Sequence, residues 1–374
     1  MKLNRHSRLA ATATMGALAL TLAACGSDNA TGDSSSETPT SGDETMAALS
    51  GELNGAGASS QESAMGAWRA GFQASYPDVI VNYDPVGSGG GRTQFLDGSV
   101  VFAGSDAALG EDELTQATDR CFGSDAMDLP VYISPIAVVF NLSGVAELNL
   151  SAETVAKIFD GKITTWDDAA IAADNEGVTL PDTAITPVHR SDESGTTKNF
   201  TDYLNKASNG AWAYDASGDW PIEGGESAQG TSGVVQAVQS GEGTIAYADA
   251  SKAGDLGKVS IKVGDSYVAP SEEAAAKTLD VSQRDETRTA NDIVIDIDRT
   301  TTEAGAYPLI LVSYLVACQT YDAQSDVDNV KAFLSYIASA EGQSASESAA
   351  GSAPISDTLR ADVQAGIDSI SLKS

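Results

Sequence analysis

The stretch VYISPIAVVFNL, residues 131–142, and a second one, AYPLILVSYLVACQ at residues 306–319, are long and nearly continuous apolar runs. Runs of this kind predict strands that are buried on both faces of a sheet. Around them, helical and strand signals alternate from residue 49 onward. This alternation predicts an α/β architecture, in which ligands bind beyond the carboxyl ends of the strands.

Two helices follow directly from the spacing of apolar residues. One helix face near the start of the domain carries Met65, Trp68, Phe72 and Tyr76. The segment TSGVVQAVQS (231–240) predicts another helix, with its valines facing inward. Near the end of the chain, the Ser/Ala/Gly-rich residues 338–356 read as a polar connection before a last helix at 358–372.

The N-terminus has the features of a secretory signal. Residues 1–10 are basic, and a short apolar run leads to Leu22-Ala23-Ala24-Cys25, which resembles the cleavage box of bacterial lipoproteins. We therefore expect residues 1–24 to be removed and Cys25 to carry the lipid, with a plain signal peptide as the alternative. Residues 25–48 are small, polar and acidic, and predict a flexible tether between lipid and domain.

The overall charge narrows the choice of partners. The chain has 53 acidic and 21 basic residues, a formal charge of −32. This balance argues against nucleic acid as a partner and against binding to anionic lipid through a basic patch. It fits a monomeric extracytoplasmic protein that is held at the outer face of the cell membrane by its lipid.

Once Cys25 is assigned to lipid, two cysteines remain, Cys121 and Cys318. In an oxidising compartment an even pair favours a disulfide, with two separate buried thiols as the alternative.

Four segments place Ser, Thr or Gly where a strand should meet a helix. Helix N-termini leave backbone N–H groups unpaired, and these groups together with nearby hydroxyls can bind an anion. Any one of these serines could equally be a simple helix cap. The four segments are NGAGASSQES (54–63), VGSGGGRT (86–93), FAGSDAAL (102–109) and HRSDESGTTKNF (189–200).

Two charged residues give these turns their chemical character. Arg190 supplies one guanidinium of a geometry suited to oxyanions, and Asp192 could hold it in place or be a solvated turn acid. Asp106 would repel an oxyanion unless that anion has a proton to donate, which phosphate has and sulfate at neutral pH lacks. The alternative for Asp106 is a helix N-cap.

These segments, with ITTWDDAAI and GTIAYADA, resemble the phosphate-binding lipoprotein of the bacterial high-affinity phosphate ABC transporter. The resemblance spans most of residues 51–320 and implies the periplasmic-binding-protein fold, two α/β lobes crossed by two strands and closing on phosphate. It implies that the two apolar runs are these crossovers, which places both Cys121 and Cys318 on the side of the first lobe. The implied lobes are residues 49–135 with 312–374, and residues 136–311.

The resemblance also implies the site residues. The family's usual Thr-Phe pair is Ser59-Ser60 here, and Ser60 would act through its backbone. The implied phosphate ligands are Ser59, Ser60, Ser88, Asp106, Arg190, Ser194, Gly195 and Thr196. The implied partners are inorganic phosphate and the permease subunits of the transporter, with no cofactor.

Two other classes of function remain as alternatives. A hydrolase needs a base beside its nucleophile or a set of metal ligands, but the histidines are only His6, in the signal, and His189, read as a strand or hinge residue. There is no GxSxG motif, so we expect no catalytic residue and no metal site, although an all-carboxylate metal site stays open. The second alternative is a receptor for another tetrahedral oxyanion, sulfate or molybdate.

Overall fold

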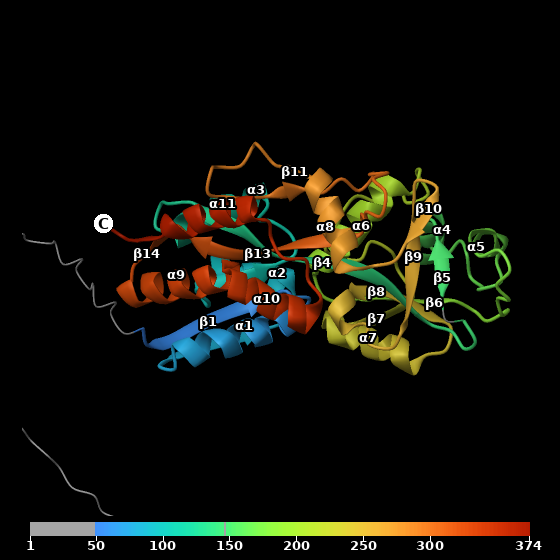
Figure 1. Cartoon of the computed structure of the whole chain (residues 1–374), viewed down its shortest axis with the longest axis horizontal. Coiled ribbons are helices and arrows are strands. Elements are labelled where there is room, and N and C mark those ends of the chain that lie inside the picture. Colours follow the sequence, from blue (N-terminus) through green and yellow to red (C-terminus); the bar gives the residue numbers. More distant parts are fainter. Residues whose placement is uncertain (1–48, 146) are drawn as a thin grey trace, which may run out of the picture. The chain divides into compact units, whose positions relative to one another are not determined.

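A sixteen-residue strand, β4 (Ala126–Asn141), connects two groups of strands. Its first part pairs antiparallel with β13 (Ile310–Cys318), and its second part pairs antiparallel with β8 (Thr244–Asp249). Apart from Asn141, every residue of β4 and β13 is buried. The prediction that the two apolar runs form strands buried on both faces is therefore confirmed. Figure 1 shows β4 between β13 and β8.

The chain is described by a computed structural model that covers residues 49–145 and 147–374. The predicted signal peptide (1–24), the lipid site Cys25 and the tether (25–48) lie outside these residues. In the described ranges, no helix combines the length and the hydropathy that crossing a membrane requires.

The first group of strands has the order β2-β1-β3-β13-β4. Its three parallel strands are β1 (Gly51–Gly57), β2 (Val79–Asp84) and β3 (Phe102–Ser105). The helices associated with this group are α1 (Glu62–Ser75), α2 (Ser88–Leu96), α3 (Glu111–Arg120), α9 (Gln324–Ala338), α10 (Ala340–Ala350) and α11 (Asp357–Asp368). A short parallel pair, β14 (Thr320–Tyr321) with β15 (Ser371–Leu372), ends the chain.

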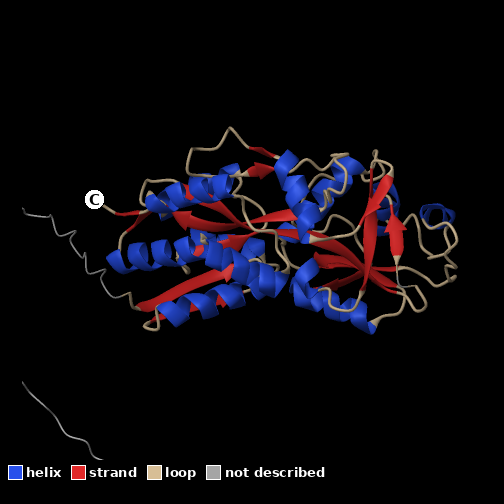
Figure 2. Cartoon of the chain, in the orientation of Figure 1, coloured by secondary structure: helices blue, strands red, loops and turns tan. Residues whose placement is uncertain are grey.

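The second group continues through β8 to β6 (Thr186–Arg190) and β7 (Glu226–Ala228), which are parallel to one another. Its further strands are β5 (Leu148–Leu150), β9 (Gly257–Val263) and β10 (Ser266–Val268). Its helices are α4 (Ala152–Phe159), α5 (Ala169–Asp174), α6 (Gly195–Ala207), α7 (Gly230–Ser240), a 3-10 turn (Ala250–Lys252) and α8 (Glu272–Val281). A hairpin of β11 (Gln283–Arg284) and β12 (Ile295–Asp296) precedes β13, and helices flank the strands of both groups (Figure 2).

Predicted helix faces form the core. Met65, Trp68 and Phe72 of α1 are fully or almost fully buried, as the spacing predicts, whereas Tyr76 follows the helix and is half-buried. Val234 and Val238 of α7 pack against Val139 and Val188 of β4 and β6.

Two predictions near the end of the chain were wrong. The last helix, α11, ends at Asp368 rather than at residue 372, because Ser371 and Leu372 pair with β14 instead. Residues 340–350, read as part of a polar connection, form α10 beside α1. The small side chains are needed there, because a Cβ at Gly342 would lie 2.1 Å from the backbone oxygen of Tyr336, and Trp68 donates a 2.8 Å hydrogen bond to the carbonyl of Gly342. Gln343 is buried and donates to the carbonyl of Val131 at 3.0 Å. A helix can thus be buried through close backbone contact without a hydrophobic stripe.

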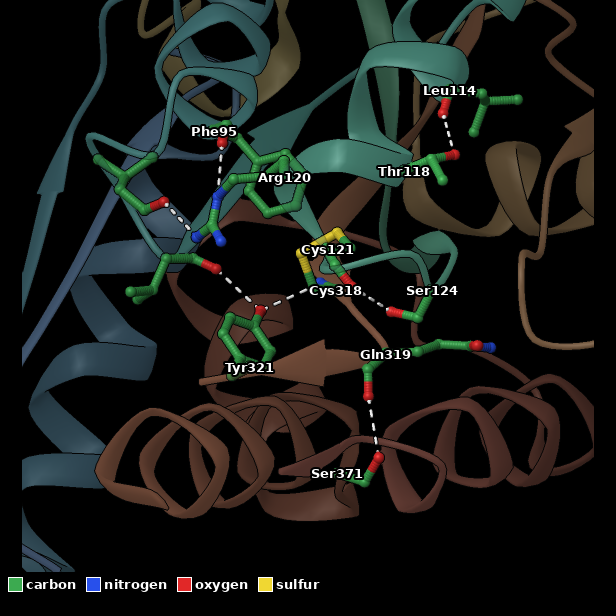
Figure 3. The surroundings of a disulfide bond; sticks show 12 residues. Phe95, Leu114, Thr118, Arg120, Cys121, Ser124, Cys318, Gln319, Tyr321 and Ser371 are labelled. Carbon is green, nitrogen blue, oxygen red and sulfur yellow. Dashed lines mark hydrogen bonds between the residues drawn. A yellow bond between two sulfur atoms is a disulfide. The ribbon is translucent and has the colours of Figure 1, made fainter. Parts of the chain in front are cut away.

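Cys121 and Cys318 form a disulfide, as the first of the two alternatives predicted. Their Cα atoms lie 5.2 Å apart, and the bond joins the end of α3 to the end of β13 across 197 residues of sequence. The surrounding side chains bind backbone carbonyls of the same region: Arg120 donates to Phe95 and Tyr321 donates to Val101 (Figure 3). The disulfide therefore fixes the last part of the crossing strand β13 to the helical layer of the first group.

Candidate anion-binding site

All four predicted turns are strand-to-helix junctions, and they meet in space. The carboxyl ends of β1, β2 and β3 lie at the same edge because these strands are parallel. The fourth junction, between β6 and α6, comes from the second group of strands. Hydrogen bonds join it to the other three through Asp106 and its neighbours.

Asp106 lies at the centre of this arrangement and is almost fully buried. Its Oδ1 atom accepts from the hydroxyls of Ser60 and Ser313, both at 2.6 Å. Its Oδ2 atom accepts from Thr196 at 2.7 Å, and its backbone N–H donates to Ser88 Oγ at 3.2 Å. The residue that precedes α3 is Gly110, so Asp106 is not the N-cap of that helix.

Arg190 ends β6 and is also almost fully buried. Its Nε and Nη2 atoms donate to the two carboxylate oxygens of Asp192 at 2.8 and 2.5 Å. Asp192 in turn accepts from the backbone N–H of Gly230 at 3.0 Å. This fork holds the guanidinium in one orientation and leaves its remaining N–H groups available as donors.

The start of α6 supplies backbone donors. Ser194 is the N-cap and its hydroxyl accepts from the N–H of Thr197 at 3.2 Å, so the next N–H groups, of Gly195 and Thr196, belong to the open first turn. A Cβ at Gly195 would lie 2.7 Å from both Asp106 Cβ and Ser88 Oγ. Only glycine fits at this contact between the two sides of the site.

Ser59 and Thr231 make a second contact between the two sides. Their hydroxyls are 2.9 Å apart, and the N–H of Thr231 donates to Ser59 Oγ at 3.0 Å. A third contact is the ion pair between Arg92 of α2 and Glu193, at 3.2 Å. The structure thus brings all eight predicted ligand residues and Asp192 into one region, in which the two groups of strands touch.

Among the residues of this region that sequence reasoning missed are Ser313, Thr231 and Asn199. Asn199 donates to the backbone oxygen of Asp106 at 2.7 Å. Two signals could have found the others. The segment AQGTSG (228–233) is a fifth Ser/Thr/Gly junction between a strand and a helix, and Ser313 interrupts an otherwise apolar run.

Tyr247 supports the second side of the site. Its hydroxyl lies 2.8 Å from Thr197 Oγ1 and accepts from the N–H of Arg190. Burial raises the pKa of Tyr247 to about 12, so this phenol stays neutral at physiological pH.

His189 lies in β6, as expected for a strand residue, and its ring stacks on Trp220 with centroids 5.0 Å apart. Its two ring nitrogens lie at hydrogen-bond distance from the carbonyls of Arg190 and Gly224. Across residues 49–145 and 147–374, no cluster of three or more His, Cys, Asp or Glu side chains is suited to a metal ion.

Comparison with known proteins places this geometry in a family. Residues 33–341 match the model of the PBP superfamily domain. The chain is 37% identical over 340 residues to the phosphate-binding protein PstS 3 of Mycobacterium leprae, which covers 89% of this chain and 90% of that protein. It is 36% identical to phosphate-binding protein PstS2 of Mycobacterium bovis, over 97% of this chain and 98% of the relative.

Solved structures show the same fold at lower identity. A high-affinity periplasmic phosphate-binding protein (PfluDING), solved with bound phosphate, superposes with a TM-score of 0.68 at 22% identity, covering 84% of this chain and 93% of that one. The phosphate-binding protein of Stenotrophomonas maltophilia gives 0.63 at 21% identity, covering 84% and 94%. With its periplasmic-binding-protein-like fold of two α/β lobes, the chain belongs to the PBP superfamily and, within it, to the family of the PstS proteins.

Proposed function

We propose that this protein is a lipid-anchored, extracytoplasmic receptor that binds inorganic phosphate by hinge closure and delivers it to an ABC-type permease for import. The names of its curated relatives support phosphate as the ligand and binding, rather than catalysis, as the activity. The geometry supports an anion site of neutral donors with one guanidinium, which requires no excess of positive charge on the whole protein.

The observation that carries the proposal is the buried carboxylate of Asp106 among donors from both sides of the site. An oxyanion that lies against this carboxylate has to donate a proton to it. Phosphate near neutral pH retains a proton in both of its common forms, and sulfate does not. The same argument disfavours the alternative of a sulfate or molybdate receptor.

Each predicted residue then has a role in the closed state. Ser59, Ser88 and Asp106 and the backbone of Ser60 would bind phosphate from the first lobe. Arg190, Ser194, Gly195 and Thr196 would bind it from the second lobe, with Asp192 holding Arg190. Because a ligand shifts a conformational equilibrium only through its differential contacts, a phosphate held from both lobes favours closure.

We assign residues 49–135 and 312–374 to the first lobe and residues 136–311 to the second. The pairing of β4 with β13 in its first part and with β8 in its second part supports a hinge within β4. The return from the second lobe would run through the residues just before β13, which pairs with β3 and β4 of the first group. The hairpin that contains β11 and β12 belongs to the second lobe by this division, although the N–H of Ile293 donates to the carbonyl of Asp128 in β4 at 2.9 Å.

The membrane anchor and the permease follow from the lipoprotein-like N-terminus and from the family. In cells supplied with labelled palmitate, the chain should incorporate label and stay with the membrane, and Cys25→Ala should abolish both. A labelled Cys25→Ala variant would contradict the anchor.

The decisive experiment is calorimetric titration of phosphate, and separately of sulfate, into the purified protein stripped of bound ligand. We expect tight one-to-one binding of phosphate, by a monomer, and no heat from sulfate at the concentrations at which phosphate saturates the site. Equal binding of both anions would contradict the assignment of Asp106. Heat from neither anion would contradict the receptor function.

A further inference from the structure

Ser313 is the one residue bonded to Asp106 that comes from a crossing strand. It lies in β13, is fully buried, and donates its hydroxyl to Asp106 Oδ1 at 2.6 Å. Its neighbours in the strand are apolar or aromatic, so it is a polar group in a run that otherwise serves the core.

The direction of this hydrogen bond is set by Gln61. The Nε2 atom of Gln61, which can only donate, lies 2.6 Å from Ser313 Oγ and 3.1 Å from the carbonyl of Tyr314. With its oxygen accepting from Gln61, the hydroxyl of Ser313 turns its proton toward Asp106. Gln61, Ser313 and Asp106 therefore form a directed chain of donors that ends on one carboxylate oxygen.

The two oxygens of Asp106 are consequently not equivalent. Oδ1 accepts from both Ser60 and Ser313, which together use its two lone pairs. Oδ2 accepts from Thr196 of the opposite side alone, and keeps one lone pair. Oδ2 is the oxygen that faces the second lobe.

We propose that Ser313 is a positioning residue for anion selectivity: it holds Asp106 so that Oδ2 presents its free lone pair to the proton of the bound anion. This inference rests on the proposed function. Without Ser313, the carboxylate could rotate about its Cβ–Cγ bond. Its lone pair would then be less strictly directed at the anion, so an anion without a proton would be excluded less strongly.

The backbone at Ser313 supports a positioning role. The pairing of β13 with β4 shifts register between Ser313 and Tyr314, so that Val131 of β4 has no partner residue opposite it. Bulges of this kind re-aim the side chains beside them and persist where that direction matters. Here the irregularity lies in the strand pair that joins the two lobes, at the residue that touches Asp106.

The test is the ratio of the dissociation constants for sulfate and phosphate, measured by calorimetry on the wild-type protein and on Ser313→Ala. We expect the ratio to fall roughly tenfold or more, the factor associated with losing a hydrogen bond to a charged group. In the double variant Asp106→Asn with Ser313→Ala, the ratio should equal that of Asp106→Asn alone. A merely structural effect of losing Ser313 would change the ratio in both backgrounds.

Ser134→Ala is the matched control, because it removes an equally buried hydroxyl from the other crossing strand, where the hydroxyl bonds Pro135 O at 3.4 Å. If Ser313→Ala folds and its ratio is unchanged, the inference is overturned, while the proposed function as a phosphate receptor is unaffected. If Ser313→Ala does not fold, Gln61→Met is measured instead. A fall of the ratio by less than tenfold supports the inference, and an unchanged ratio overturns it. Failure of the wild-type protein to bind phosphate would remove the proposed function and this inference together.

Discussion

The two sides of the site share the same local structure but differ in the charged group that each one adds. Both place a strand, a Ser/Gly turn and a helix start against the proposed position of the anion. The first side adds a carboxylate, Asp106, which is held by hydroxyls of neutral residues. The second side adds a guanidinium, Arg190, which is held by a carboxylate of its own. We infer that the second side provides attraction and the first side provides discrimination.

Asp106→Asn should break the discrimination and have the largest effect on binding. The amide can donate a hydrogen bond to an anion that has no proton, so the penalty against sulfate disappears. We expect the ratio of the sulfate and phosphate dissociation constants to fall by up to about 10⁴-fold. Calorimetric titration of both anions measures it, and a ratio equal to that of the wild type would contradict the role of Asp106.

Arg190→Ala should break the attraction without changing the discrimination. It removes the charged donor to the anion and leaves the half-buried Asp192 without its partner, and losing one member of a charge pair at a binding interface costs about 2–5 kcal/mol. Phosphate affinity should fall accordingly, while sulfate remains excluded. Arg360→Ala, which removes an arginine on α11 that pairs with Asp357, is the control and should leave affinity unchanged. Normal phosphate affinity in Arg190→Ala would refute the division of roles.

Glu193→Gln tests the contact between the sides. Its ion pair with Arg92 joins α2 of the first side to the turn before α6, so it should stabilise the closed state. Glu193 is partly exposed, and such pairs contribute about 0.2–1 kcal/mol, so we expect phosphate affinity to fall by about 1.4- to fivefold at low salt and less at high salt.

The control for this pair is Glu113→Gln. Glu113 binds the same arginine at 2.8 Å, but it lies on α3 of the first side, so its loss does not remove the link between the sides. An equal loss of affinity in both variants would show that Arg92 matters for the fold of α2 and not for closure.

The sequence predicted the parts of this comparison that are local. Strand and helix patterns indicated the α/β class, and the Ser/Gly turns indicated where N–H groups would be exposed. Ser313 and Thr231 were not predicted because their roles depend on residues far away in the chain. Ser313 donates to Asp106 across 207 positions, and the hydroxyls of Thr231 and Ser59 interact across 172. Helix α10 escaped because its burial depends on backbone contact, which leaves no apolar periodicity to detect.

Asp128 is a second buried carboxylate in this part of the molecule, and it differs from Asp106 in the charged side chains next to it. Asp128 lies in β4 and accepts from the N–H of Leu109 at 3.1 Å, but its neighbours include Asp292 as well as Arg288. Burial, together with the charge of Asp292, raises the pKa of Asp128 to about 8. In the folded protein, Asp128 therefore holds a proton that the unfolded chain releases near its ordinary pKa of 3.8.

The smallest effect on binding is expected from Asp128→Asn, which should act on stability alone. Through Asp128 the free energy of unfolding falls as the pH rises from about 4 to about 8, because the unfolded state binds fewer protons over that range. The asparagine does not titrate, so the fall in urea midpoint between pH 5 and pH 8 should become shallower, while phosphate affinity stays at the wild-type value. An unchanged pH slope would refute the raised pKa, and a changed sulfate-to-phosphate ratio would show that discrimination extends beyond Asp106 to a carboxylate that the anion does not touch.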